Sequence, residues 1–208
     1  MKEIIVGSNE AGQRITKLLK KYLREASEGV IYKMLRKKNI TLNQKKAVGK
    51  EILKEGDCIR LYLSEETLEK FQGYKAKSST DKALKETKGG KAFPEREYLT
   101  AFHHLKGISV LFENNHIILV NKPRGILSQK AAEGDLSLNE WMIGYLLHTK
   151  QFTQRQLETF RPSICNRLDR NTSGLIICAK TYAGARQINQ WIKNREIKKY
   201  YRCFITGE

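Results

Sequence analysis

Apolar side chains recur at helical spacing in four stretches of the chain. Residues 15–23 and 30–35 carry them every three or four positions, which predicts two short helices. Residues 136–147 show the same period around Trp141, and residues 182–193 repeat it with apolar side chains on one face. We therefore expect two helices near the N-terminus and two in the second half of the chain.

Other stretches alternate between apolar and polar residues, or form short apolar runs, and both patterns are typical of strands. The predicted strands cover residues 40–43, 59–63, 110–112, 116–120, 175–179 and 197–205. Gly56-Asp57 and Glu113-Asn114-Asn115 have the composition of turns immediately before a strand. Helices and strands together predict an α+β fold.

The apolar period is lost between these two groups of elements. Residues 72–106 mix glycine and serine with many lysines, which indicates a linker whose first part is flexible. Phe93-Pro94 and residues 98–104 are candidates to pack onto a neighbouring domain. We expect a small α+β unit at residues 1–71 that folds by itself, and a second unit at residues 107–208.

Charge narrows the choice of partner. The 208 residues include 39 Lys and Arg against 22 Asp and Glu, a formal net charge of +17 with a pI of about 9.7. Such an excess favours a polyanionic partner. The sequence has no basic amphipathic stretch with an apolar face, no apolar run of membrane-spanning length and no signal peptide. We expect a cytoplasmic protein that does not bind membranes.

Cysteine and histidine give no pattern of a metal site. The four cysteines are widely spaced and fit reduced, buried thiols rather than a disulfide framework: Cys58, Cys165, Cys178 and Cys203. None of the four histidines has metal-ligand spacing with Cys or Asp. No phosphate-binding glycine loop is present either. We expect neither a metal nor a nucleotide cofactor.

The strongest candidate for chemistry is Asp169. It lies between Arg167 and Arg170, in a loop that closes through Thr172-Ser173-Gly174 into the predicted strand 175–179. Positive charge nearby favours an ionised carboxylate, which can act as a nucleophile or a base. The alternative is a surface aspartate paired with arginine in a turn.

A second candidate is a basic patch between Lys33 and Lys50, where no residue is acidic. Its basic residues are Lys33, Arg36, Lys37, Lys38, Lys45, Lys46 and Lys50. Such a patch can contact phosphates without reading sequence. The alternative is a charged face that is simply solvated.

Three ordered motifs resemble the RluA-type pseudouridine synthases, which isomerise uridine to pseudouridine in RNA. They are Arg167-Leu168-Asp169-Arg170 with the Thr-Ser-Gly that follows, Ile118 to Gly125 with its Asn-Lys-Pro-Arg-Gly, and Ile197 to Gly207 with its Lys-Tyr-Tyr. Asn166 stands where the family usually has histidine. The resemblance covers roughly residues 107–208 and implies a mixed, mainly antiparallel catalytic sheet, here only in part.

The resemblance also implies roles. Asp169 would attack the target nucleotide at the sugar C1′ or at base C6, and Tyr201 would lie against the base and assist proton loss from C5. Arg167 and Arg170 would hold phosphate or fill the gap left by the extruded base. The Lys122-Pro123-Arg124-Gly125 turn is interpreted as structural support, with Gly125 in an unusual backbone conformation.

Residues 1–71 resemble the small alpha-L RNA-binding module of ribosomal small-subunit protein four, through apolar pattern and Gly56-Asp57. The resemblance implies that Lys33, Arg36, Lys37, Lys45 and Lys46 bind RNA. We expect the RNA to be ribosomal RNA and the protein to be a monomer. The alternatives are a non-catalytic RNA-binding or ribosome-associated protein and a DNA-binding regulator, although the latter lacks a helix-turn-helix and dimerising heptads.

Catalytic domains of the family continue well past the Lys-x-Tyr strand. Their later part carries a basic residue that pairs with the catalytic aspartate and a Thr-Gly-Arg-x-His-Gln-like segment. We therefore expect the chain to be truncated at its C-terminus, with strands near Leu119, Ile177 and Phe204 in one sheet and with apolar surface exposed.

Overall fold

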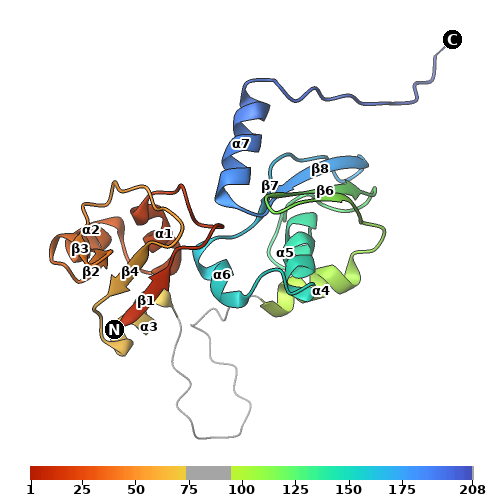
Figure 1. The fold of residues 1–208 in the computed structure, drawn as a ribbon. Helices are drawn as coiled ribbons and strands as arrows, with labels where there is room; N and C mark the ends of the chain where they lie inside the picture. Colours follow the sequence, from red (N-terminus) through yellow and green to blue (C-terminus); the bar gives the residue numbers. More distant parts are fainter. Residues whose placement is uncertain (74–94, 208) are drawn as a thin grey trace, which may run out of the picture.

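The elements of the chain surround two separate hydrophobic cores (Figure 1). The computed structural model describes residues 1–73 and 95–207. One core draws its buried residues from Ile4 to Leu61, and the other from Tyr98 to Cys178. The second core includes Tyr98 and Ala101, which lie before residue 107, where the sequence predicts the second unit to begin.

The first unit is a four-stranded antiparallel sheet with helices packed on it. Its sheet order is β1-β4-β2-β3. Its elements are β1 (Lys2–Ile5), α1 (Ile15–Tyr22), α2 (Glu28–Arg36), β2 (Ile40–Leu42), β3 (Lys45–Lys46), β4 (Cys58–Leu61) and α3 (Glu65–Gln72). The apolar face of α1 is fully buried, as its sequence period predicts, and α2 begins at Ser27, whose hydroxyl accepts from the Val30 amide.

The second unit has its own four-stranded antiparallel sheet, in the order β5-β6-β8-β7. Its elements are α4 (Glu95–His104), β5 (Ser109–Glu113), β6 (Ile117–Lys122), α5 (Leu138–His148), α6 (Gln154–Thr159), β7 (Ser163–Ile164), β8 (Gly174–Ala179) and α7 (Tyr182–Lys193). Helices α4 and α5 lie on one side of this sheet (Figure 1). The mixed α and β composition is confirmed, and every strand pair among the described residues is antiparallel.

Strand alternation decides which face of the second sheet is buried. Ile118, Val120 and Ile176 are buried in the core that includes α5. Their neighbours Leu119 and Ile177 point to the other face, where they are paired in register. Helices α4 and α5 approach each other closely at Gly144. A Cβ atom at this position would lie only 2.1 Å from the carbonyl oxygen of Tyr98, so the close packing requires glycine.

The predicted linker is corrected at its C-terminal end. Residues 95–104, assigned to the linker at 72–106, form α4, and Tyr98 and Ala101 are buried in the second core. Residues 98–104 therefore pack onto the second unit, as the sequence indicated, but they do so as part of a helix that packs against α5. Residues 74–94, the rest of the predicted linker, lie outside the described residues.

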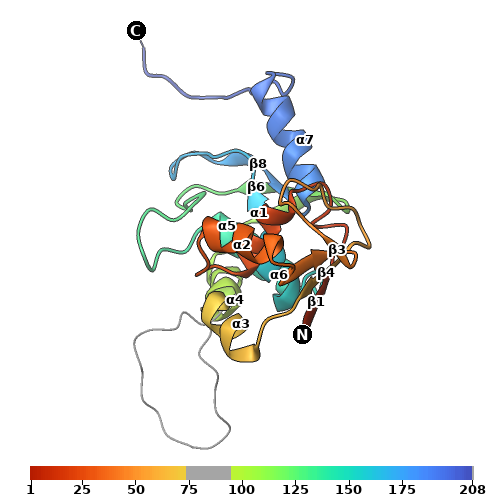
Figure 2. The same ribbon diagram turned by 90° about the vertical axis from the view of Figure 1, so that its left-hand side faces the viewer.

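The predicted strand at residues 197–205 is also wrong. Residues 195–207 run away from the end of α7 (Figures 1 and 2), and none of them joins a strand. Leu119 and Ile177 share one sheet, as expected, but Phe204 does not. A strand needs a neighbour to complete its hydrogen-bond ladder, and among the described residues no segment pairs with this one.

The two units touch through polar contacts near α1 and α6, which lie together (Figures 1 and 2). The Thr159 hydroxyl donates to the buried carboxylate of Glu10. The Tyr182 amide donates to the carbonyl of Asn9 at 3.0 Å. These bonds fix the N-terminal unit against the base of α7.

Cysteine burial differs from the expectation of four buried thiols. All four cysteines are free, but Cys178 alone is buried, while Cys58 and Cys165 are half-buried and Cys203 is exposed. Burial raises the pKa of the Cys165 thiol to about 11.

In the part of the chain that the structure describes, no helix is long and apolar enough to cross a membrane.

Candidate active site

The Asp169 loop leads directly into β8, beside the end of β6. Gly174, the first residue of β8, is paired with Lys122, the last residue of β6. Asp169 is exposed, and its carbonyl accepts a hydrogen bond of 3.1 Å from the Thr172 amide, which closes a turn. The sheet therefore presents this carboxylate to solvent from a short, defined loop.

Lys122 stabilises the Asp169 loop through hydrogen bonds from its side chain. Its side chain is completely buried, although lysine is rarely found inside proteins. The ammonium group donates to the carbonyls of Ile126 at 2.9 Å, Pro123 at 3.1 Å and Arg170 at 3.4 Å. Burial lowers the pKa of Lys122, and the nearby charge of Asp169 acts in the opposite direction. The sequence-based interpretation of this turn as structural support agrees with these contacts.

The segment after Lys122 and the Asp169 loop are joined at two further points. Gly125 and Arg170 exchange hydrogen bonds, from the Gly125 amide to the Arg170 carbonyl at 2.8 Å and from the Arg170 Nε to the Gly125 carbonyl at 3.1 Å. Gly125 has a φ of 87°, the unusual backbone conformation predicted for it. The Ser128 hydroxyl bonds the backbone of Leu168 on both its N–H and C=O sides. These contacts bracket Asp169 on both flanks.

Asn166 has a structural role that the sequence does not reveal. Its side-chain oxygen accepts from the Ile177 amide at 2.8 Å, and its side-chain nitrogen donates to the Leu175 carbonyl at 3.1 Å. The amide thus substitutes for a neighbouring strand along β8. It anchors the start of the Asp169 loop to the sheet.

The two arginines flanking Asp169 do not neutralise it through an ion pair. Among the described residues, neither Arg167 nor Arg170 forms a salt bridge with the carboxylate. Arg170 instead bonds the Gly125 carbonyl, and both arginines are exposed. The alternative of an aspartate paired with arginine in a turn is therefore not observed.

A hollow of about 510 Å³ opens beside this loop, on the sheet face opposite α5. Its walls come from Leu119, Leu168 and residues 172–175 on one side, and from Ile192 and residues 197–202 on the other. The volume lies within the range of small-molecule sites. The hollow is partly apolar, with Lys198, Lys199 and Arg202 at its basic side.

Tyr200 and Tyr201 both line this hollow, although alternation along a strand would place neighbouring side chains on opposite faces. They are 84% and 67% exposed. Alternation applies to a paired strand, and residues 197–205 are not one. The structure thus brings Tyr201 to the same hollow as Leu168 and Thr172 of the Asp169 loop, whereas Asp169 itself is not among the residues that line it.

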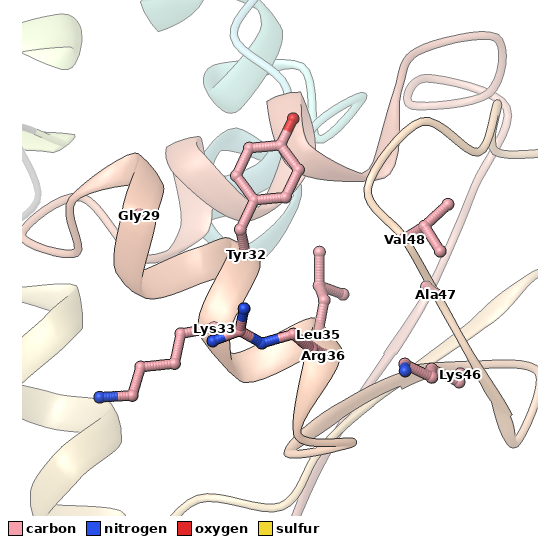
Figure 3. Close-up of a pocket in the computed structure, with 8 residues that line it drawn as sticks. All are labelled: Gly29, Tyr32, Lys33, Leu35, Arg36, Lys46, Ala47 and Val48. Carbon is pink, nitrogen blue, oxygen red and sulfur yellow. The ribbon is translucent and has the colours of Figure 1, made fainter.

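Three residues of the basic patch, Lys33, Arg36 and Lys46, line a hollow of about 440 Å³ between α2 and the segment from Lys46 to Val48. Figure 3 shows Tyr32, Lys33 and Arg36 projecting from α2, with Lys46 and Val48 across the hollow. Lys37 lies at the C-terminal end of α2, and Lys45 begins β3. All five predicted RNA-binding residues of this patch are exposed.

Residues 116–208 match the family model described as RNA pseudouridylate synthase. This part of the chain is therefore similar to the RNA pseudouridylate synthases. The matched region contains β6, the Asp169 loop, β8, α7 and both tyrosines. It begins within the second unit predicted from the sequence.

Curated relatives align along nearly the whole length of the chain. An uncharacterized RNA pseudouridine synthase of Mycoplasma capricolum is 27% identical over 99% of the chain and 59% of the relative. Ribosomal large subunit pseudouridine synthase C of Salmonella typhi is 25% identical over 100% of the chain and 55% of the relative. The chain thus spans somewhat more than half the length of these curated relatives.

One solved structure, titled human RNA pseudouridylate synthase domain containing 4, covers 50% of this chain and 35% of its own, with 16% identity and a TM-score of 0.36. A similarity that distant does not establish a common fold.

Sequence reasoning missed two residues that hold the Asp169 loop in place, Ser128 and Asn166. Ser128 carries no motif signal, because its partner Leu168 lies forty residues away along the chain. Asn166 stands out in the sequence only as a departure from the usual histidine. Elsewhere in the described residues, no group of three or more His, Cys, Asp and Glu side chains could hold a metal ion.

Proposed function

We propose that this protein is an RNA pseudouridine synthase that isomerises uridine to pseudouridine in ribosomal RNA, with Asp169 as its nucleophile. The observation that carries the proposal is the Asp169 loop, clamped by Lys122 and Ser128 beside a hollow that Tyr201 also lines. The loop lies within the part of the chain that matches the family model. The names of the relatives support ribosomal RNA as the substrate class.

The isomerisation of uridine to pseudouridine requires a carboxylate in a defined orientation. The C1′–N1 glycosidic bond breaks, a C1′–C5 bond forms, and a proton leaves C5 while N1 gains one, so the product has the atoms of the substrate. A carboxylate can bond the anomeric carbon or the base during this exchange, as carboxylates do in glycosidases. The reaction transfers no electrons to another molecule, and its balance requires no oxidant or reductant.

Positioning in the proposed site relies on backbone contacts. Lys122 holds the carbonyl after Asp169 and Ser128 holds the residue before it, so the carboxylate projects from a fixed backbone. A preorganised nucleophile loses little freedom when the substrate arrives. Tyr201 is assigned to stack against the extruded base and to assist proton removal from C5, while Arg167 and Arg170 contact phosphate.

Residues 1–71 are proposed to be an alpha-L-like RNA-binding module. Lys33, Arg36, Lys37, Lys45 and Lys46 supply phosphate contacts around the hollow shown in Figure 3. Tyr32, which is 41% exposed at the same hollow, offers a ring on which a base can stack. The module supplies affinity, and residues 107–208 supply chemistry.

The test maps pseudouridine in ribosomal RNA from cells with and without this gene, and then restores the gene as wild type, as Asp169→Asn and as Glu133→Gln. Glu133 is an exposed acidic residue of the loop before α5 and serves as the matched control. We expect a modified uridine to disappear on deletion and to return with the wild-type gene and the control. Asp169→Asn should fail to restore it while the purified variant still binds RNA.

Restoration by Asp169→Asn would overturn the role of that carboxylate. If deletion changes no uridine although the purified protein binds ribosomal RNA, the protein is a non-catalytic RNA-binding protein and the proposed activity is wrong.

A further inference from the structure

The junction between the two units contains a basic groove that the proposed site does not use. It has a volume of about 450 Å³ and is lined by α1, by residues 160–163 and by one side of α7. Among the described residues, the charged side chains that line it are all cationic: Lys17, Lys21, Arg161, Arg186 and Lys193. Helix α1 lies beside the N-terminal end of α7 in both views (Figures 1 and 2).

Two of these lysines are held in place by aromatic rings from the other unit. The Lys17 Nζ lies 4.9 Å from the centre of the Tyr182 ring, and the Lys21 Nζ lies 5.1 Å from that of Phe160. Contacts of this kind orient an ammonium group without neutralising its charge. Both cations therefore remain available to an anion in the groove.

Repulsion among the positive charges that line the groove destabilises the fold unless a negative charge offsets it. Burial, helped by the charges of Lys17 and Arg161 and opposed by that of Glu10, lowers the pKa of Lys21 to about 8. Arg186 and Lys193 add positive charge from α7 on the same groove. The cluster at the seam between the units is therefore a place where a bound anion would relieve the repulsion.

Helix α7 connects this groove with the hollow beside Asp169. Arg186 and Lys193 line the groove, whereas Ile192 of the same helix lines the other hollow. From Arg186 to Ile192 the helix rises about 9 Å. A nucleic-acid strand that follows α7 would reach both places.

We propose that this groove is a second phosphate-binding site for the RNA substrate, formed jointly by the N-terminal unit and α7. It would bind backbone phosphates of RNA whose target uridine occupies the hollow beside the Asp169 loop. The inference rests on the proposed function. The proposed site implies that the bound RNA extends across the interface between the two units. The first unit would then help to position the RNA, in addition to supplying affinity.

Proton linkage gives the site a signature that surface lysines lack. Lys21 loses its proton as pH rises through about 8 in the free protein, and a bound phosphate favours the charged form. Binding therefore takes up a proton above that pH and weakens as pH rises. Between about pH 7 and pH 9 the affinity should fall by up to about tenfold, because one proton is linked to binding.

The test measures binding of a fluorescein-labelled, uridine-containing stem-loop of ribosomal RNA to the 208-residue chain. The variants are Lys21→Met, Arg186→Gln and, as the matched control, Lys20→Gln. Lys20 is an exposed lysine on α1 that does not line the groove. Lys21→Met removes a partly buried charge and should leave the fold intact, which thermal unfolding verifies.

Lys21→Met and Arg186→Gln should each weaken binding and lower the logarithmic salt slope by roughly one unit. Lys21→Met should also lose most of the pH dependence, while Lys20→Gln keeps it. Wild-type affinity and pH dependence in Lys21→Met would overturn the proposal. An equal loss in Lys20→Gln would do so as well, since it would show a non-specific charge effect. Because pseudouridine mapping is independent of these measurements, a failed groove and a failed synthase activity are distinguishable.

Discussion

The Ser128 hydroxyl donates a hydrogen bond to the carbonyl of Leu168 at 2.5 Å and accepts one from the amide of Leu168 at 3.0 Å. One buried side chain thus satisfies both backbone groups of the residue that precedes Asp169. The loop that carries the proposed nucleophile is therefore positioned from a segment that carries no chemical motif of its own.

We predict that Ser128→Ala slows turnover without weakening RNA binding. The change leaves the amide and carbonyl of Leu168 without their partner, which should destabilise the protein by about 1–3 kcal/mol. It also frees the Asp169 loop, so kcat should fall while the Kd for RNA stays constant. Thermal unfolding and single-turnover kinetics measure the two effects. The matched control is Gln129→Ala, which changes the exposed residue next in the chain.

Unchanged kcat in Ser128→Ala, with the expected loss of stability, would show that Ser128 supports the fold and not the position of the nucleophile.

The basic patch of the first unit should govern affinity and not chemistry. Replacing Arg36, Lys37, Lys45 and Lys46 by glutamine should weaken RNA binding and lower the logarithmic salt slope by roughly one unit for each phosphate that is no longer bound. At saturating RNA the kcat should stay at its wild-type value. Binding measured across a series of salt concentrations decides this, and an unchanged slope would mean that the patch is only solvated.

Acid should destabilise the protein through Glu113. Its carboxylate accepts hydrogen bonds from Lys180 at 2.7 Å and Tyr145 at 2.8 Å. Burial alone would raise the pKa of Glu113, but these bonds outweigh burial and hold it below 4.5. A lowered carboxylate pKa stabilises the fold above pH 4.5, and that contribution disappears as pH falls through the folded pKa.

Glu113→Gln should therefore lose about 1.5–3 kcal/mol of unfolding free energy at neutral pH. Its stability should also vary less with pH in the acid range than that of the wild type. Denaturant unfolding at a series of pH values tests both points. Glu55→Gln, which changes an exposed carboxylate in a turn, should behave like the wild type.

The first unit should fold without the second but be less stable alone. Its core is closed by residues of the same unit, with Leu63, Leu68 and Phe71 packed against it. Separation removes the bond from Thr159 to Glu10 and exposes that carboxylate. Residues 1–73 should unfold cooperatively on heating, at a lower temperature than the first unit within the whole chain. A non-cooperative transition would contradict the proposed domain boundary.

Much of the local structure follows from the sequence. The apolar period of residues 182–193 predicts a helix over those residues, and α7 occupies the same range. The short apolar runs around Leu119 and Ile177 predict two strands, which pair in register as β6 and β8. Period and turn composition are local properties, so a single stretch of chain contains the information that these elements need. The Asp169 loop and the Gly125 turn are local motifs for the same reason.

Tertiary structure decided what depends on partners distant in sequence. Residues 95–104 became a helix of the core because α5 offers Gly144 for close packing, and residues 197–205 did not become a strand because no described segment pairs with them. Ser128 meets Leu168, and Lys21 meets Phe160, only once the chain has folded. Composition and period describe what a segment prefers. Which cation faces which ring, and which hydroxyl fixes which loop, are determined by contacts between segments that the sequence does not place side by side.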